Sequence, residues 1–116
     1  MRKIMFLILL FMLLTPFAFA DREVETVKAY TSNTLIQRGD VKIYRIEFVA
    51  KANNSSFAIY DSLTAEAGST TNVKTEGSEA TANNSKLYDF TNKPLEFSTG
   101  AYLVISGTAD VVVHYK

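Results

Sequence analysis

The sequence predicts an all-β protein: a single small β-sandwich, jelly-roll or Ig-like, with about seven to nine short and mostly antiparallel strands. Apolar residues recur in short runs, several of which alternate with the period of two that is typical of strands. Clusters of Gly, Pro, Asn and Asp separate these runs, as turns do. No segment has the apolar spacing of a convincing amphipathic helix. The 116 residues are enough for one domain and not for two.

The first twenty residues are predicted to be a signal peptide that precedes the domain. Basic Arg2 and Lys3 lead into the apolar run Ile4–Leu14, and a small-x-small ending follows. The run is short for a membrane span, so an uncleaved anchor is the less favoured alternative. The residues expected to define the cleavage point are Ala18, Ala20 and Asp21. We therefore expect a signal peptide over 1–20 and a domain over 21–116, located in the periplasm, at the cell surface or outside the cell, with no stable membrane span after cleavage.

The mature chain is expected to be slightly acidic and free of disulfides. Cleavage removes two of the 12 basic residues and none of the 12 acidic ones, which leaves a net charge of about −2. Nucleic acid and anionic membrane surfaces are therefore not expected partners, because both require a concentrated basic surface. The chain has no cysteine, so stability has to come from sheet packing or from oligomerisation.

The first half of the domain is expected to be mostly extended. Arg38-Gly39-Asp40 and the polar segment Lys51–Ser56 carry the residues of turns. The apolar segments around these turns are Val24–Thr31, the short piece Thr34–Gln37, Val41–Ala50 and Phe57–Asp61.

The middle of the chain is the most polar region. The pattern of Ser62–Gly68 is compatible with one helical turn that is capped by Ser62. Ser69–Ser85 has little apolar content and is expected to be a long surface connection, in which Asn72–Glu76 could form an edge strand. Lys86–Phe90 then returns as a short strand.

The segment Leu95–Tyr115 is predicted to be a β-meander of three runs. Pro94 precedes it, in a position where a missing N–H is tolerated. Its last strand should place Val111, Val113 and Tyr115 on one face, and Val112 and His114 on the other. That second face is not plainly suited to solvent, so this strand is expected to close the fold and also to meet a neighbouring subunit. His114 is expected to be a pH-sensitive contact there.

Alternation along Val41–Ala50 places large apolar side chains on both faces of one strand. A strand with a single buried face needs only one such set, so we expect a partner subunit to cover the second. The first face is expected to hold Tyr44, Ile46 and Phe48. The predicted subunit contacts are the residues of the second face together with two from the last strand, namely Val41, Ile43, Arg45, Glu47, Val49, Val112 and His114.

No catalytic, cofactor or metal site is predicted, and no cofactor is expected. His114 is the single histidine, and the sequence has no nucleophile elbow to accompany it. Several acids, Asp61, Glu66, Glu76 and Glu79, lie around the polar segment but lack the spacing of a calcium loop. Solvated loop acids are the favoured interpretation, and the protein is predicted not to be an enzyme.

Three further patterns have an ordinary interpretation beside a functional one. Arg38-Gly39-Asp40 matches a tripeptide that adhesion receptors bind, but each residue also suits a turn. Asn53, Asn54 and Asn83 match the N-glycosylation pattern, for which polar turn composition is the preferred interpretation. The aromatic residues could form a sugar-stacking platform, but without Trp they more readily suggest a core or a subunit interface. These aromatics are Tyr30, Tyr44, Tyr60, Tyr88, Tyr102 and Tyr115, with Phe48, Phe57, Phe90 and Phe97.

Residues 41–115, about three quarters of the mature chain, resemble a group of small uncharacterised β-rich proteins found among bacteriophage structural genes. The segments that carry the resemblance are V-K-I-Y-R-I-E-F-V-A, F-A-I-Y-D and K-P-L-E-F-S-T-G-A-Y-L-V-I-S-G-T-A-D-V-V-V-H-Y. It implies a structural or decorating role in a symmetric assembly. The signal peptide departs from that group, because particles assembled in the cytoplasm need no export.

The function expected from the sequence is therefore that of a non-enzymatic, exported structural or interaction protein. It would self-associate as a subunit of a surface, a filament or a virion-like particle. The alternative is a small carbohydrate- or ligand-binding module, with a surface glycan as its partner.

Overall fold

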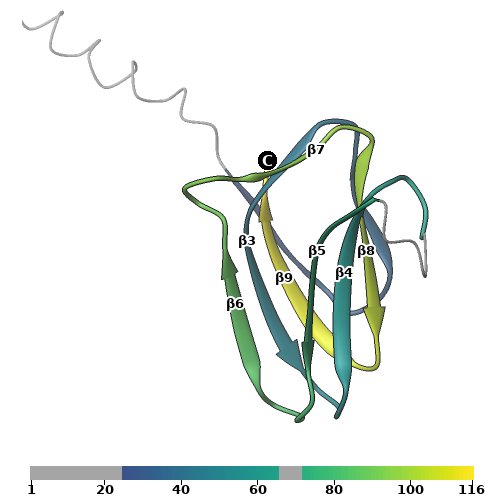
Figure 1. Cartoon of the computed structure of the whole chain (residues 1–116), viewed down its shortest axis with the longest axis vertical. Helices are drawn as coiled ribbons and strands as arrows, with labels where there is room; N and C mark the ends of the chain where they lie inside the picture. Colours follow the sequence, from purple (N-terminus) through teal and green to yellow (C-terminus); the bar gives the residue numbers. More distant parts are fainter. Residues whose placement is uncertain (1–24, 66–71) are drawn as a thin grey trace, which may run out of the picture.

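The chain folds into two antiparallel sheets (Figure 1). A computed structural model describes residues 25–65 and 72–116, which contain nine strands and no helix. The prediction of an all-β, sandwich-like fold is thereby confirmed. The predicted signal peptide, including Ala18, Ala20 and Asp21, lies outside the described residues. Within the described ranges there is no helix that could cross a membrane.

Sheet A has the strand order β1-β9-β3-β6, and the short β7 also pairs with β3. Its strands are β1 (Thr26–Tyr30), β3 (Val41–Ala50), β6 (Ser85–Asp89), β7 (Leu95–Phe97) and β9 (Ala109–Tyr115). The last strand of the sequence is therefore a central strand of this sheet, with β1 on one side and β3 on the other. Backbone pairing takes up both of its edges, so only the face of β9 is open to a neighbour.

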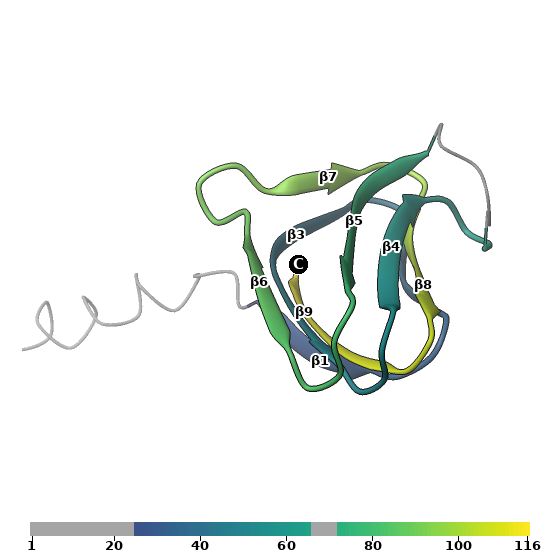
Figure 2. The same ribbon diagram turned by 60° about the horizontal axis from the view of Figure 1, so that its bottom comes forward.

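Sheet B has the strand order β2-β8-β4-β5. Its strands are β2 (Thr34–Arg38), β4 (Ser55–Asp61), β5 (Val73–Glu79) and β8 (Gly100–Ser106). The two sheets face each other (Figure 2) and enclose the apolar core. The rings of Phe48 on β3 and Phe57 on β4 meet between the sheets with centroids 5.1 Å apart. The core residues are Ile36, Val41, Ile43, Ile46, Phe48, Ala50, Phe57, Ile59, Phe97, Ala101, Leu103, Ala109, Val111, Val113 and Tyr115.

A β-bulge at Tyr44 divides β3 into two parts. Ile43 pairs with Tyr115 and Arg45 pairs with His114, so Tyr44 is the extra residue between two consecutive pairs. An extra residue reverses the inward and outward alternation of side chains along a strand. On the edge of β3 opposite to β9, strand β7 pairs with the residues before the bulge and β6 pairs with the residues after it.

The bulge corrects part of the predicted interface. Val41 and Ile43 were expected on an outer face, but they are 2% and 0% exposed. They face the core before the bulge, whereas Ile46, Phe48 and Ala50 face it afterwards. One core and a bulge therefore explain why β3 has apolar residues at both odd-numbered and even-numbered positions, without a covering partner. Tyr44, expected on the face of Ile46 and Phe48, is instead the bulged residue.

The polar middle of the chain contains a full edge strand. β5 runs from Val73 to Glu79, further than the expected Asn72–Glu76. Gly77 permits the ring of Tyr88 to pack directly over it, since a Cβ there would lie 2.1 Å from the Tyr88 hydroxyl. Ser62–Ala65 form bends without a helical turn, and residues 66–68 of the expected turn lie outside the described residues. The ring of Tyr88 therefore connects β6, an edge strand of sheet A, with β5, an edge strand of sheet B.

One end of the sandwich is held by the hydroxyl of Ser55, the first residue of β4. Ser55 is fully buried, and its Oγ lies 2.8 Å from the carbonyl oxygen of Ala52 and 2.9 Å from that of Thr108. The same oxygen accepts a hydrogen bond from the Thr108 N–H at 3.2 Å. Gly107 precedes Thr108 with φ +81°, and a Cβ there would lie 2.8 Å from Ser55 Oγ. This contact fixes the turn between β8 and β9.

Candidate subunit interface

The outward side of sheet A, which we call the outer A face, consists of three rows of side chains that cross the strands. These rows follow from the strand register and alternate with buried residues. The first row is Val27, His114, Arg45 and Asp89. The second row is Ala29, Val112, Glu47 and Leu87. The third row is Asp110, Val49 and Ser85.

The outer A face brings together most of the predicted subunit contacts. Five of the seven lie on it, namely Arg45, Glu47, Val49, Val112 and His114. They share one face because each lies beyond the bulge or on β9, where the period of two is unbroken. Val41 and Ile43 do not belong to it, because they are core residues.

Two apolar residues of this face were missed by the sequence reasoning. Val27 on β1 and Leu87 on β6 are 55% and 58% exposed, and they are the exposed large hydrophobic residues of the described chain. Local alternation indicates that each of these side chains lies on the opposite side of its strand from those of its sequence neighbours. Only the strand order shows that both fall on the same face of the sheet. With Ala29, Val49 and Val112 they give the face an apolar content that a partner could cover.

Most charges on the outer A face are paired. Arg45 Nη2 lies 3.9 Å from Asp89 Oδ2, and Lys51 Nζ lies 3.7 Å from Asp110 Oδ2. Such exposed pairs contribute little stability on their own, but they leave the face with small net charge. The Thr91 hydroxyl and backbone N–H both donate to Asp89, and with the Arg45 charge they lower the pKa of Asp89 below its ordinary value. Asp89 is therefore ionised throughout the neutral range.

His114 lies in the first row of this face and is the most enclosed of its polar groups. Its side chain is 19% exposed, and its Nε2 is buried without a hydrogen-bond partner. The nearest opposite charge is Glu47 Oε2, 4.0 Å from that nitrogen. The imidazole lies between Val27 on β1 and Arg45 on β3, on the outward side of sheet A, where a protein that covered the outer A face would contact it. Among the described residues, no group of three or more potential metal ligands is found.

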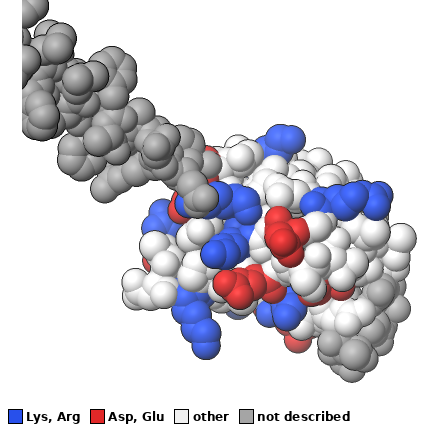
Figure 3. Space-filling model, turned by 90° about the horizontal axis from the view of Figure 1, so that it is seen from above, with Lys and Arg blue, Asp and Glu red and all other residues white. Residues whose placement is uncertain are grey.

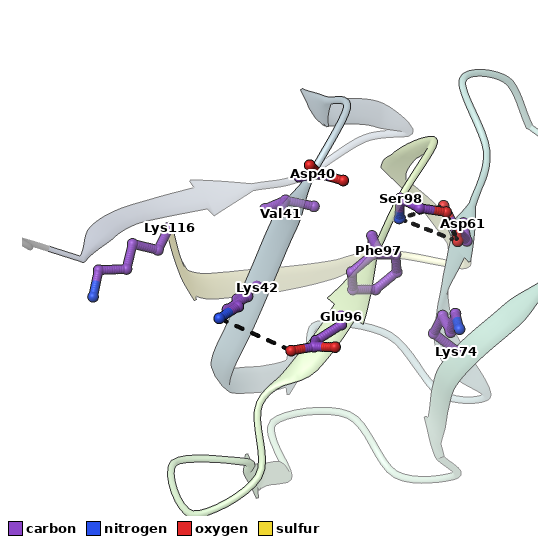
Figure 4. Close-up of a pocket in the computed structure, with 9 residues that line it drawn as sticks. All are labelled: Asp40, Val41, Lys42, Asp61, Lys74, Glu96, Phe97, Ser98 and Lys116. Carbon is purple, nitrogen blue, oxygen red and sulfur yellow. Dashed lines mark hydrogen bonds and ion pairs between the residues drawn. The ribbon is translucent and has the colours of Figure 1, made fainter.

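A second feature is an open cleft of about 630 Å³ beside β7 (Figure 4). Its lining comes from the ends of several strands, and the residues are Asp40, Val41, Lys42, Asp61, Lys74, Glu96, Phe97, Ser98 and Lys116. Seen from this end, basic and acidic side chains are interspersed and neither sign dominates (Figure 3). Lys42 Nζ lies 3.9 Å from Glu96 Oε1, between the paired strands β3 and β7 (Figure 4).

Asp61, the acid of the cleft that the sequence singled out, has a structural task. Its carboxylate accepts hydrogen bonds from the backbone N–H groups of Ser98, Thr99 and Gly100, with the Thr99 bond at 2.8 Å. Partial burial raises the pKa of Asp61, but these hydrogen bonds outweigh it and hold the pKa below its ordinary value. The carboxylate is therefore engaged in fixing the turn between β7 and β8. Glu76 and Glu79, two of the other acids considered, lie on β5, and Glu66 lies outside the described residues.

The remaining sequence patterns take structural positions. Arg38 ends β2, and Gly39 and Asp40 turn the chain into β3, with Gly39 at φ +81°. Asn54 and Asn83 adopt left-handed turn conformations, with φ values of 56° and 68°.

Asn53 has a turn role as well, because its side-chain oxygen accepts a hydrogen bond from the Ala82 N–H at 2.9 Å. Much of the aromatic set is buried, as shown by Phe48, Phe57, Phe97 and Tyr115.

The sequence matches no protein-family model, and no curated protein sequence matches it at a significant level.

Proposed function

We propose that this chain is an exported, non-enzymatic structural protein that self-associates through the outer A face as a subunit of a surface, filament or particle. The observation that carries the proposal is the composition of that face. It unites five predicted contact residues with Val27 and Leu87, the exposed large hydrophobic residues of the described chain. An apolar face with paired charges suits contact with a copy of itself, because the same patch is presented by both partners.

Association through a face is favoured over association through strand edges. Both edge strands of sheet A carry a lysine on the side of the core: Lys28 aligns with Val113, and Lys86 aligns with Phe48. Inward-pointing charges on edge strands discourage pairing with another chain. Lys86 Nζ also donates to the Ser78 carbonyl on β5 at 2.8 Å, which fastens this edge of the molecule.

Two features of the sequence support an exported assembly subunit. The basic and apolar pattern over residues 1–20 supports export. The resemblance of residues 41–115 to small β-rich phage structural proteins supports a role in a repeating assembly.

The proposal is tested by the mass of the mature chain, residues 21–116, in size-exclusion chromatography with light scattering over a wide concentration range. We expect oligomers in the wild type and a shift to monomer in Leu87→Glu and in Val27→Asp. Leu35→Glu is the matched control, because Leu35 lies on an edge strand of the other sheet, in register with Tyr102. Thermal melts of each variant establish that it is folded. A wild-type chain that stays monomeric at high concentration would overturn the proposal.

A ligand-binding module is the second candidate, and one observation favours it. Tyr60 and Tyr102 are register partners on the outer side of sheet B, in a row that continues to Leu35 and Val73. Tyr60 is only 7% exposed, so the half-buried Tyr102 is the ring of this pair on which a sugar could stack. Glycan-array binding that disappears in Tyr102→Ala would favour this candidate, and the absence of any binding would remove it.

A further inference from the structure

We infer that contact between copies through the outer A face depends on protonation, with His114 and Glu47 as the groups that set this dependence. The inference rests on the proposed function, since it concerns the regulation of that same face. It starts from the buried and unpartnered Nε2 of His114, 4.0 Å from the Glu47 carboxylate.

Glu47 differs from the other acids of the face in the kind of partner it has. Asp89 is paired with Arg45, and Asp110 is paired with Lys51. These partners keep their charge throughout the neutral range, because Lys and Arg titrate far above it. The partner of Glu47 is a histidine, the kind of side chain that can gain or lose its charge near neutral pH.

Two neighbouring strands supply the charged groups around His114, and a third supplies apolar ones. On β3 they are Arg45 and Glu47, and on β6 the nearest is Asp89, which the Arg45 side chain reaches. On β1 the register partner is Val27, and the outward residues Val27 and Ala29 carry no charge.

On β9 itself the charged residue is Asp110, and Lys116 follows directly after the strand. Lys116 Nζ lies 5.6 Å from the centroid of the Tyr44 ring. Glu47 is thus the carboxylate that His114 protonation would neutralise.

Protonation of His114 affects association because contact between copies removes water from the outer A face. Removing water from a carboxylate is costly unless a positive group or hydrogen-bond donors compensate it. With neutral His114, each copy would bury one uncompensated Glu47, and a symmetric contact would do so twice. With protonated His114, each Glu47 faces an imidazolium and the buried charges cancel. The associated state therefore binds more protons than the free chains, so association tightens as the pH falls.

The experiment measures the dissociation constant of the mature chain by analytical ultracentrifugation between about pH 8 and about pH 5.5 at constant ionic strength. We expect a tightening of about tenfold or more over this range. In Glu47→Gln we expect tight association near pH 8 and no tightening on acidification, because no carboxylate remains to be neutralised and a protonated His114 would be buried without a counter-charge. In His114→Gln we expect weak association that does not respond to pH. Asp110→Asn is the matched control and should keep the wild-type pH dependence.

The α-amino group of the mature chain also titrates in this range. It is retained in Glu47→Gln, so a tightening on acidification that persists in that variant would overturn the inference. Wild-type association that is independent of pH, or that weakens on acidification, would overturn it and leave the proposed function standing. A chain that is monomeric at every pH would instead overturn the proposed function.

Discussion

The two ends of β4 perform the same task with different chemistry. Ser55, its first residue, holds the turn after β8 with a neutral hydroxyl that is fully buried. Asp61, its last residue, holds the turn before β8 with a half-buried carboxylate that accepts three backbone N–H groups. Strand β8 is thus fixed at both ends by the strand that pairs with it. The stability of the Ser55 end therefore depends on packing and burial, whereas the stability of the Asp61 end depends on charge and therefore on pH.

The largest effect is expected at the Ser55 end, from Gly107→Ala. The substitution places a Cβ at φ +81° and 2.8 Å from Ser55 Oγ, and we expect a loss of about 3 kcal/mol from the free energy of unfolding. Gly39→Ala is the matched control, because Gly39 has the same φ and nothing within 4 Å of its Cβ position. It should lose only about 1 kcal/mol, the cost of the backbone conformation. Equal losses in urea titrations of the two variants would show that the Ser55 contact is unimportant.

Ser55→Ala should be the next most damaging change. It leaves the Thr108 N–H without its acceptor in a buried place, for which we expect a loss of about 2 kcal/mol. Ser56→Ala, one residue along and half-buried on the outer side of sheet B, should change stability by less than about 0.5 kcal/mol. Chemical denaturation of both variants provides the measurement, and similar losses in the two would contradict the role given to Ser55.

Asp61→Ala should destabilise the opposite end to a smaller extent. Water can partly replace a half-buried acceptor, so we expect a loss of about 1 kcal/mol. Asp40→Ala is the control within the same cleft, because its side chain is exposed, and it should be nearly neutral. Hydrogen exchange should show faster exchange at the N–H groups of Ser98 and Thr99 in Asp61→Ala alone. Unchanged exchange there would refute the assignment.

The smallest effect is the pH dependence that separates the two ends. The pKa of Asp61 is lowered in the folded protein, so its contribution to stability is present above the ordinary value of about 3.9 and is lost as the pH falls through the folded value. The stability difference between wild type and Asp61→Asn should therefore shrink in acid. The difference between wild type and Ser55→Ala should stay constant over the same range. Parallel curves for both variants in denaturation from pH 6 to below about pH 3 would contradict the distinction.

The sequence was sufficient for the fold class because period-two runs and turn residues are local properties. The strands β3, β6, β7 and β9 lie at the predicted segments. The β-meander predicted for Leu95–Tyr115 is wrong, because β7 and β9 pair with β3 in sheet A whereas β8 pairs with β2 and β4 in sheet B. The bulge at Tyr44 could not be predicted, since a bulge is defined by the register with a neighbouring strand. Its trace in the sequence is the change of parity between Ile43 and Ile46, which was interpreted as a covered outer face.

The candidate interface was predictable only in part, for the same reason. Arg45, Glu47 and Val49 lie on one face because they follow the bulge at an unbroken period of two. The positions of Val27 and Leu87 depend on which strands flank β9 and β3, and pairing between distant segments leaves no local pattern. Gly77 was likewise seen as part of a polar connection, because its close packing against Tyr88 is a tertiary contact.

The bulge at Tyr44 also governs how β3 tolerates changes of length. Val41 and Ile43 are in one phase of the strand and Ile46 and Phe48 are in the other, and Tyr44 is the residue that reconciles them. Deleting Tyr44 would remove the bulge and keep Arg45 and Glu47 on the outer A face, because Ile43 and Arg45 already pair with consecutive residues of β9. Deleting a residue between Arg45 and Ala50 would instead turn the side chains that follow it to the opposite face, whereas a length change in the loop between β6 and β7 would leave both phases intact. Within β3, loss of a single residue is therefore compatible with this fold at the bulge and incompatible in the paired part of the strand that follows it.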